Sequence, residues 1–254
     1  MENDILNADV LKEKLKNIEI HYYSSIDSTN AQAKRLFNQG NKQRMLIVSD
    51  EQTAGRGRQG KSFFSPKSTG IYMSYVYHPM KDFKSAVSAT TAASVAVCRA
   101  IENLCPLRPE IKWVNDIYLN GKKICGILCE AITDNETKKI SCVIIGIGVN
   151  IKTADFPQGI ENASSLNADI KRADLIAEIT KELSAVADSD FSEFIDYYKE
   201  HSMIIGKEIV FTKNGVSQNA RAVEIENDGG LRVELESKEI ITLRSGEISV
   251  RKRN

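Results

Sequence analysis

The segment GRGRQGKS at 55–62 limits the possible folds more than any other stretch, because it matches two phosphate-binding patterns with strict structural requirements. Both G-x-G-x-x-G and G-x-x-x-x-G-K-S need a strand before the glycines and a helix after them. A strand is plausible at 45–51, but Pro66 and Gly70 follow the segment, and then comes the alternation of another strand. No acidic residue that would bind a nucleotide ribose ends a strand about 20 residues further on. We therefore predict a loop that belongs to neither nucleotide-binding fold.

The chemistry of this loop suits an anionic ligand. Its three glycines allow the backbone to approach a ligand closely, and Arg56, Arg58 and Lys61 place three positive charges within six residues. A solvated basic turn would explain the charges and one glycine. It would not explain the adjacent Phe63 and Phe64, whose rings could stack on a base or cover a ligand.

The segment IKWVNDIYLNGKKICGILCE at 111–130 predicts a strand followed by a β-hairpin, because Asn120-Gly121 is a strong signal for a two-residue turn. In the second arm, strict alternation puts Lys123 on the same side as Cys125, Ile127 and Cys129. The other side then carries Ile124, Gly126, Leu128 and Glu130. A lysine among apolar neighbours is costly to bury unless an anion meets it. From this stretch alone, we prefer an ordinary lysine at a hairpin end.

The whole-chain composition excludes several classes of protein. Among 254 residues, 34 are Lys or Arg and 34 are Asp or Glu, so no global positive field attracts nucleic acid or anionic lipid. The N-terminus lacks the apolar core of a signal peptide, and the longest apolar run, at 143–149, is too short to span a bilayer. We expect a cytoplasmic protein without a membrane partner. Five cysteines without a CxxC pattern and three scattered histidines argue against zinc or disulfides, so the cysteines are expected in the core.

The remaining chain predicts an α+β fold in which helices cover a mixed or antiparallel sheet. Helices are expected within 27–40, 85–103, 171–187 and 190–201. From Gly206 onward, short alternating strands are separated by Asn-Gly, Asp-Gly-Gly and Ser-Gly turns, which is typical of a small C-terminal β-barrel. We therefore divide the chain into a larger domain at 1–205 and a small domain at 206–254.

Two separate stretches resemble the signatures of bacterial biotin protein ligases. GRGRQGKSFFSP resembles the GRGRxGR-aromatic loop of that family, and KWVNDIYLNGKKICGILCE resembles its KWPND…K-x-x-G-I-L-x-E hairpin. Further agreement lies in DSTN at 27–30, GIGVN at 146–150 and GEISVR at 246–251. The sequence departs from the family pattern at four positions: Gln59 and Lys61 where arginine is common, Phe63 where tryptophan is common, and Val114 where proline is usual.

The resemblance implies a ligase that works in two steps. The biotin carboxylate attacks the α-phosphate of ATP and releases pyrophosphate, and a lysine of a biotin carboxyl carrier protein or domain then attacks the biotinyl-5'-adenylate. Because the first step brings two anions together, cations and Mg²⁺ must offset their repulsion. The resemblance assigns the catalytic roles to Lys123, Arg58 and Arg56. Lys123 is expected to touch both the carboxylate and the phosphate, while the loop of Arg58 closes over the adenylate.

The resemblance also implies which residues hold the substrates. Those for biotin are Ser28, Thr29, Gln52, Gly55, Arg56, Lys123, Gly126, Leu128, Gly146 and Val149. Those for ATP or the adenylate are Arg58, Phe63, Asn115, Asn150 and Arg251. Asp116 is the candidate Mg²⁺ ligand, with a hydrogen-bonded turn residue as the alternative. The hydroxyl of Ser28 or Thr29 could instead be only an N-cap, and the glycines and aliphatic residues could be ordinary sheet packing.

Other functions stay open at this point. The nearest is a lipoate ligase of related fold, and a non-catalytic protein that binds biotin or a nucleotide is the simplest. Some relatives also repress transcription through an N-terminal winged helix, but only 26 residues precede Asp27 and they contain no basic recognition helix, so we expect no DNA binding. The identity of the acceptor protein and the formation of a homodimer are left undetermined.

Overall fold

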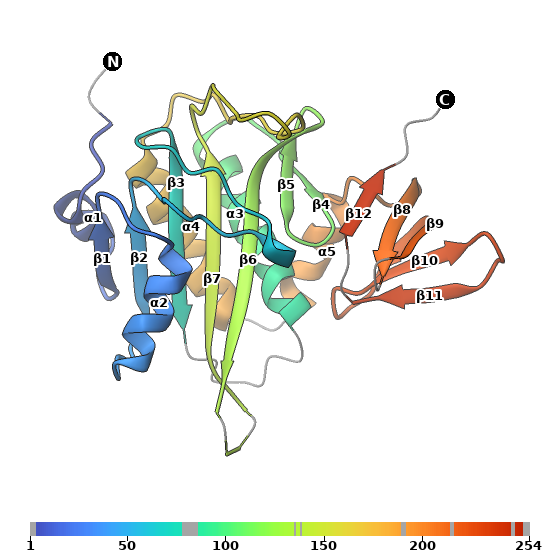
Figure 1. Cartoon of the computed structure of the whole chain (residues 1–254), viewed down its shortest axis with the longest axis horizontal. Helices are drawn as coiled ribbons and strands as arrows, with labels where there is room; N and C mark the ends of the chain where they lie inside the picture. Colours follow the sequence, from blue (N-terminus) through green and yellow to red (C-terminus); the bar gives the residue numbers. More distant parts are fainter. Residues whose placement is uncertain are drawn as a thin grey trace.

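The fold is built around a seven-stranded sheet, described here from a computed structural model that covers residues 4–77, 86–134, 136–137, 139–188, 192–213, 216–244 and 247–250. The order of its strands is β1-β2-β3-β7-β6-β5-β4. The strands are β1 (Glu19–Tyr23), β2 (Met45–Ser49), β3 (Gly70–Tyr77), β4 (Glu110–Lys112), β5 (Asp116–Leu119), β6 (Lys122–Thr133) and β7 (Ile140–Asn150). β1 pairs with β2 in parallel, and the other neighbours are antiparallel. The predicted mixed sheet is confirmed (Figure 1).

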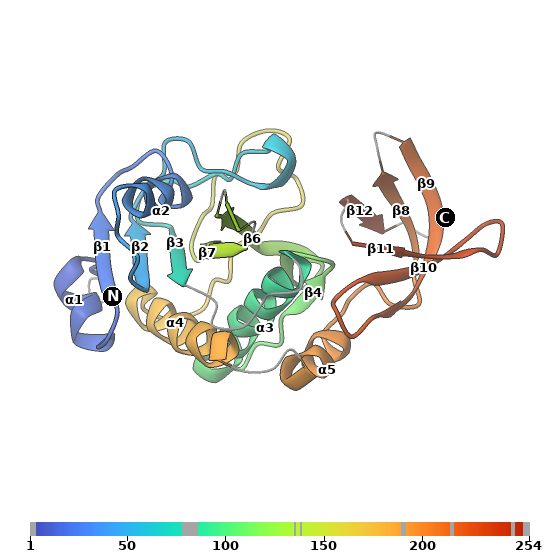
Figure 2. The ribbon, with the colours of Figure 1, turned by 90° about the horizontal axis from the view of Figure 1, so that it is seen from below.

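Helices lie on both faces of this sheet (Figure 2). One face carries α3 (Ala86–Leu104) and α4 (Arg172–Asp188), with α5 (Ser192–Glu200) beside α3. The opposite face carries only α2 (Thr29–Asn38), which packs on β2, β3 and β7. The short helix α1 (Ala8–Lys14) packs against β1 and α4. The expected helices are all present, and the larger part of the second face is left to loops.

The buried helix α3 combines small and polar residues without leaving hydroxyls unpaired. Ala92, Ala96 and Ala100 are at most 3% exposed, and their small side chains let the helix lie close to its neighbours. The buried hydroxyls of Thr91 and Ser94 donate to carbonyls one turn earlier in the same helix. The polar atoms of this segment are therefore satisfied locally.

The C-terminal strands form a separate antiparallel sheet of five strands, in the order β11-β10-β9-β8-β12. They are β8 (Glu208–Lys213), β9 (Val216–Ile225), β10 (Leu231–Leu235), β11 (Ile240–Leu243) and β12 (Glu247–Val250). The antiparallel character is as predicted from the turn residues. The small C-terminal β-barrel expected from the sequence corresponds to this sheet, whose described strands have two edges, β11 and β12. The buried Trp113 indole donates to the Gly229 carbonyl at 2.9 Å and so joins the two sheets.

A buried arginine links three distant parts of the chain. Arg172, at the start of α4, is 3% exposed and pairs with Asp50 at 2.5 Å, just beyond β2. Its Nε atom also lies 2.8 Å from Asp4 Oδ2, so the N-terminal segment is held against α4. Folding removes the Arg172 guanidinium and the two carboxylates from water together. Each group therefore needs its oppositely charged partner to compensate for the hydration that it loses.

We predict that Arg172→Met lowers the free energy of unfolding by roughly 3–5 kcal/mol, because two partly buried carboxylates lose their partner. Equilibrium unfolding in urea, followed by circular dichroism, measures the change. Lys181→Met is the control, since Lys181 is 69% exposed and forms only a surface pair with Glu178. Equal unfolding midpoints for the two variants would show that the Arg172 network adds nothing to stability.

Candidate functional site

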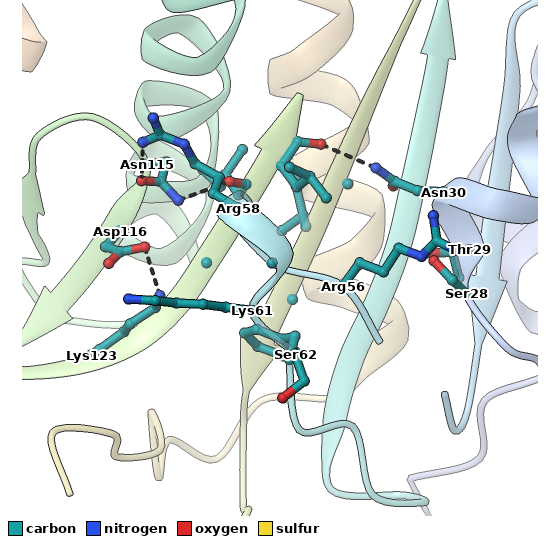
Figure 3. Close-up of a pocket in the computed structure, with 18 of the residues that line it drawn as sticks. Ser28, Thr29, Asn30, Arg56, Arg58, Lys61, Ser62, Asn115, Asp116 and Lys123 are labelled. Atoms are coloured by element: carbon teal, nitrogen blue, oxygen red, sulfur yellow. Dashed lines mark hydrogen bonds and ion pairs between the residues drawn. The ribbon is translucent and has the colours of Figure 1, made fainter. Parts of the chain in front are cut away.

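A pocket of about 250 Å³ opens on the α2 face of the large sheet, at the place where several strand residues lack side chains. Two rows of paired residues cross the strands there. One row is Ser74, Gly146 and Leu128. The other is Tyr72, Gly148, Gly126 and Asp116. The N-terminus of α2, the loop at 52–63 and strands β5, β6 and β7 surround this floor (Figure 3).

The glycines are required because other groups occupy the space above them. A β carbon on Gly148 would overlap the ring of Phe63, and one on Gly126 would lie 3.3 Å from the same ring. A β carbon on Gly146 would overlap the side-chain amide of Asn30. Phe63 therefore rests on bare backbone, with its ring edge-on to Tyr72 at a centroid distance of 6.4 Å.

The glycine-rich loop closes on itself and does not lead into a helix. Gly57 N–H donates to the Lys61 carbonyl at 2.7 Å, and Phe63 N–H donates to the Gly55 carbonyl at 2.9 Å. A single 3-10 turn spans Arg58–Gly60, and the next regular element is β3. These backbone N–H groups donate hydrogen bonds within the loop. A phosphate cradle would instead require them to be presented together at a helix N-terminus. The prediction that neither glycine-rich nucleotide motif applies is confirmed.

Lys123 lies on the opposite side of β6 from the side predicted by strict alternation. Between β5 and β6 the register shifts, so that Ile117 pairs with Cys125 but Tyr118 pairs with Lys123. This bulge inserts Ile124 as an extra residue and re-aims the lysine. A β carbon on Gly126 would lie 3.3 Å from Lys123 Nζ, which places the ammonium over the pocket floor. The segment at 162–164 pairs with the Lys123 backbone and holds it in this position.

Charged groups gather at one end of the pocket. Asp116 Oδ1 is buried and forms an ion pair with Lys123 Nζ at 2.7 Å, although no described group donates a well-aligned hydrogen bond to it. Figure 3 shows Lys61 extending toward the same end. Arg58 donates to Asn115 Oδ1 at 2.9 Å, and Asn115 Nδ2 donates to the carbonyl of Ile127. The loop is thereby tied to the sheet.

The other end of the pocket is formed by hydroxyls and amides, with Arg56 as its charged residue. Ser28 caps α2 by accepting from Ala31 N–H, and Thr29 N–H donates to Gln52 Oε1 at 2.9 Å. Gln52 Nε2 in turn donates to Ser65 Oγ. Figure 3 shows Arg56 pointing toward Ser28 and Thr29. The predicted cap is confirmed, and the same residues line the pocket.

Asp27 fixes the entry to this helix. Its carboxylate accepts from the Ser28 N–H and from both terminal nitrogens of Arg35. The hydrogen bond from Arg35 is the main cause that lowers the pKa of Asp27 to about 2. The carboxylate is therefore ionised at any pH at which the protein is studied, and the start of α2 stays anchored.

Most of the predicted site residues line the pocket, three of the described ones do not, and one cannot be placed. The lining includes Ser28, Thr29, Gln52, Arg56, Arg58, Phe63, Asn115, Asp116, Lys123, Gly126, Leu128 and Gly146. Gly55 lies behind the loop, where a β carbon would overlap the Phe63 carbonyl. Val149 is fully buried in the main core, and Asn150 is 4% exposed and donates to the Ser164 carbonyl. Arg251 lies outside the described residues.

Three residues that line the pocket, Asn30, Lys112 and Gly148, are not among the site residues predicted from the sequence. Alternation in GIGVN would have found Gly148, since residues 146 and 148 must share a face whereas 149 must point away. Asn30 stands in the DSTN segment, but only the tertiary structure brings it beneath Gly146.

Among the described residues, neither the cysteines nor a cluster of metal-binding side chains indicates a second functional site. The five cysteines are free. Burial raises the pKa of Cys129 to about 12 and raises that of Cys125 further, so these thiols stay protonated. Within the described part of the chain, no three His, Cys, Asp or Glu residues are placed to hold a metal ion together. No helix in the same ranges has the length and apolar character needed to cross a membrane.

The chain belongs to the biotin/lipoate A/B protein ligase family, whose model matches residues 22–150. Residues 204–251 match the biotin protein ligase C terminal domain. The resemblance inferred from the sequence motifs is thus confirmed. Both matches agree with the arrangement of a large mixed sheet that carries the pocket and a small antiparallel sheet that follows it.

Individual relatives support this membership. The chain is 36% identical over 176 residues to the bifunctional ligase/repressor BirA of Bacillus spizizenii, covering 66% of this chain and 54% of that protein. It is 34% identical over 137 residues to the biotin--[acetyl-CoA-carboxylase] ligase of Paracoccus denitrificans, covering 53% and 55%. The match thus spans about half the length of these relatives. The biotin protein ligase of Aquifex aeolicus, solved with biotin and ATP, superposes with a TM-score of 0.78 at 25% identity, covering 92% of this chain and 99% of that one.

We predict that Gly146→Ala destabilises the protein by roughly 1–3 kcal/mol, because the added methyl group overlaps a buried amide that cannot move without losing its partners. Gly126→Ala is the matched control, since its nearest neighbours are a flexible lysine and the Phe63 ring at 3.3 Å. Urea unfolding of both variants tests the difference. A Gly146→Ala protein as stable as the control would mean that Asn30 is not held in place.

Proposed function

We propose that this chain is an ATP-dependent biotin protein ligase. It would join biotin to AMP, releasing pyrophosphate, and then transfer biotin to a lysine of a biotin carboxyl carrier protein or domain, releasing AMP. The observation that carries the proposal is the composition of the pocket: an end with hydroxyls, amides and Arg56, a glycine floor, and a cluster of charged groups around Lys123 at the other end. The Aquifex aeolicus ligase of similar fold was solved with biotin and ATP.

In the first step, a biotin carboxylate oxygen forms a bond to the α-phosphorus while the bond to the pyrophosphate oxygen breaks. The two reactants are both anions, so the approach is favourable only where fixed positive charges stabilise the transition state. Lys123 is proposed to contact both reactants, and Arg56 and Arg58 to bind the charges on either side. Lys123 has its ammonium 2.7 Å from Asp116, an anion that a substrate carboxylate could replace.

The proposed biotin slot runs along the glycine floor. Ser28, Thr29 and Gln52 would hold the ureido ring, and the walls would be Gly126, Leu128 and Gly146. A slot of this kind binds its ligand through apolar contact and a few polar groups that set its orientation. Val149 and Gly55 would act indirectly, the first from the core beneath the floor and the second by allowing the loop to close.

The adenylate is proposed to lie between the loop and β5. Arg58, Phe63 and Asn115 line this part of the pocket. Asn150 is assigned here as a supporting residue, since it donates to Ser164, whose own N–H donates to the Lys123 carbonyl. Arg251 remains a prediction from the family pattern.

Asp116 could bind a magnesium ion that arrives with ATP, because such an ion needs few ligands from the protein. Mg²⁺ is commonly held by one or two carboxylates together with substrate phosphates and waters, and Asp116 offers a buried carboxylate oxygen whose charged neighbour is the Lys123 ammonium at 2.7 Å. When bound, the ion would offset part of the phosphate charge. The nearby cations Lys123 and Arg58 would orient the phosphates with or without it.

Several finer predictions are part of this proposal. Residues 1–205 would carry both substrate sites, and 206–254 would complete the adenylate site. A cytoplasmic location remains a prediction from the sequence. A lipoate ligase is the alternative reaction, because the family model covers both substrates.

We predict that the purified protein, given biotin, Mg²⁺ and ATP, forms biotinyl-adenylate and pyrophosphate. Thin-layer chromatography with labelled ATP follows the adenylate, and a coupled assay follows pyrophosphate. The same reaction with lipoate is the comparison. Faster turnover with lipoate would replace the biotin assignment by the lipoate one, and binding of biotin without pyrophosphate release would make the protein a binding protein.

We predict that Lys123→Ala slows adenylate formation by about a hundredfold, since a charge-assisted contact in the transition state is worth roughly 3 kcal/mol. Single-turnover kinetics at saturating biotin and ATP measure the effect. Lys122→Ala is the control, because Lys122 is adjacent in sequence and exposed. Rates within a few-fold of each other in the two variants would make Lys123 an ordinary hairpin residue.

A further inference from the structure

We propose that Glu130, at the outer end of a chain of buried hydrogen bonds, sets the direction of those bonds and so makes the slot select a ligand that donates N–H groups to Thr29. The inference rests on the proposed function and assigns a positioning role to a residue remote from the reacting atoms. The chain of bonds runs from Glu130 through Asn30 and Ser74 to Thr29.

The side-chain amide of Asn30 can point only one way. Its Nδ2 atom lies 2.8 Å from Glu130 Oε2 and 3.2 Å from the Leu128 carbonyl oxygen. A carboxylate and a carbonyl are both acceptors, so the side of the amide that faces them must be the NH₂ group. The other carboxylate oxygen of Glu130 is occupied by Lys34 at 2.6 Å. Asn30 Oδ1 is consequently directed toward Ser74.

The orientation of Asn30 then determines the hydroxyl protons. Ser74 Oγ lies 2.6 Å from Asn30 Oδ1 and 2.8 Å from Thr29 Oγ1, and it has one proton to give. Because the amide oxygen can only accept, Ser74 donates to Asn30. Ser74 is fully buried and Asn30 is 4% exposed, so water is not available to correct a mismatch between them.

Thr29 is left with its own proton directed into the protein. Its hydroxyl has two acceptors within reach, Gln52 Oε1 at 3.2 Å and the oxygen of Ser74. In either arrangement, the remaining lone pair of Thr29 is what the pocket offers to a ligand. The ureido ring of biotin carries two N–H donors, whereas the dithiolane ring of lipoate carries none. The direction of the chain therefore favours biotin over lipoate.

The chain also explains why a carboxylate, rather than an amide, stands at position 130. In Glu130→Gln, one side-chain oxygen must serve both Asn30 and Lys34, and the NH₂ group finds no acceptor between them. In Asn30→Asp, two carboxylates face each other at the distance of a hydrogen bond. Each single substitution thus mismatches donor and acceptor at the contact between positions 30 and 130, while the volume of the side chain changes little.

The double variant Glu130→Gln with Asn30→Asp restores a matched chain. The amide introduced at position 130 would accept from Lys34 and donate to one oxygen of the carboxylate introduced at position 30, whose other oxygen accepts from Ser74. The net charge equals that of Asn30 with Glu130. Only the weaker contact to the Leu128 carbonyl, at 3.2 Å, is lost. Independent effects of the two changes would add, whereas a shared role in polarity makes the second change reverse the first.

The experiment measures biotin affinity by isothermal titration calorimetry for wild type, both single variants, the double variant and Lys34→Met. We expect biotin to bind roughly tenfold more weakly or worse in each single variant, since a buried group is left unpaired, and to recover in the double variant. Lys34→Met, which keeps Glu130 as an acceptor, should bind like wild type. In adenylate formation, the KM for biotin should rise while the KM for ATP stays within about twofold.

Two results would overturn the inference while leaving the proposed function intact. One is wild-type affinity in both single variants, and the other is a double variant that loses as much affinity as the two single variants combined. Urea unfolding of each variant separates loss of folding from loss of polarity. Failure of the wild type itself to bind biotin would remove the proposed function, and this inference with it.

Discussion

The site depends on one constraint, which is that the backbone of the large sheet is uncovered at Gly126, Gly146 and Gly148. A sheet face normally fills the space above it with side chains, and here that space admits Phe63 and Asn30 instead. The first brings the basic loop onto the sheet, and the second connects the start of α2 to β6. Three segments that are far apart in sequence meet here because these glycines of β6 and β7 have no side chains to keep them apart.

Charge in the pocket is organised around a single acid. Asp116 holds Lys123, while Arg58 is held by the neutral Asn115. Ligand-free cations placed close together would repel, and both of these contacts reduce that cost without burying an uncompensated charge. The opposite end of the pocket contains the amides and hydroxyls around Thr29 and Gln52, with Arg56 beside them. A ligand with a neutral ring and an anionic tail matches this division of polarity.

Local signals in the sequence predicted the parts of the fold that short segments determine by themselves. The Asn120-Gly121 turn has both residues at positive φ, as a two-residue hairpin requires, and Ser28 caps its helix. Strict alternation predicts the wrong face for Lys123, because the register between β5 and β6 shifts at a bulge that the pattern within one strand does not reveal. Arg172 and Asp50 are separated by 122 positions, and neither carries a local signal for the other. Contacts of that kind follow only from the assembled fold.

The closed base of the glycine-rich loop has a mechanical consequence. Because Gly55 and Phe63 are bonded to each other, the residues between them form a hoop whose perimeter cannot lengthen or shorten. Arg56, Arg58 and Lys61 all have their backbone on that hoop, and the ring of Phe63 at its base rests on the glycine floor. The attachment points of all three cations are therefore fixed to the sheet through the same short base.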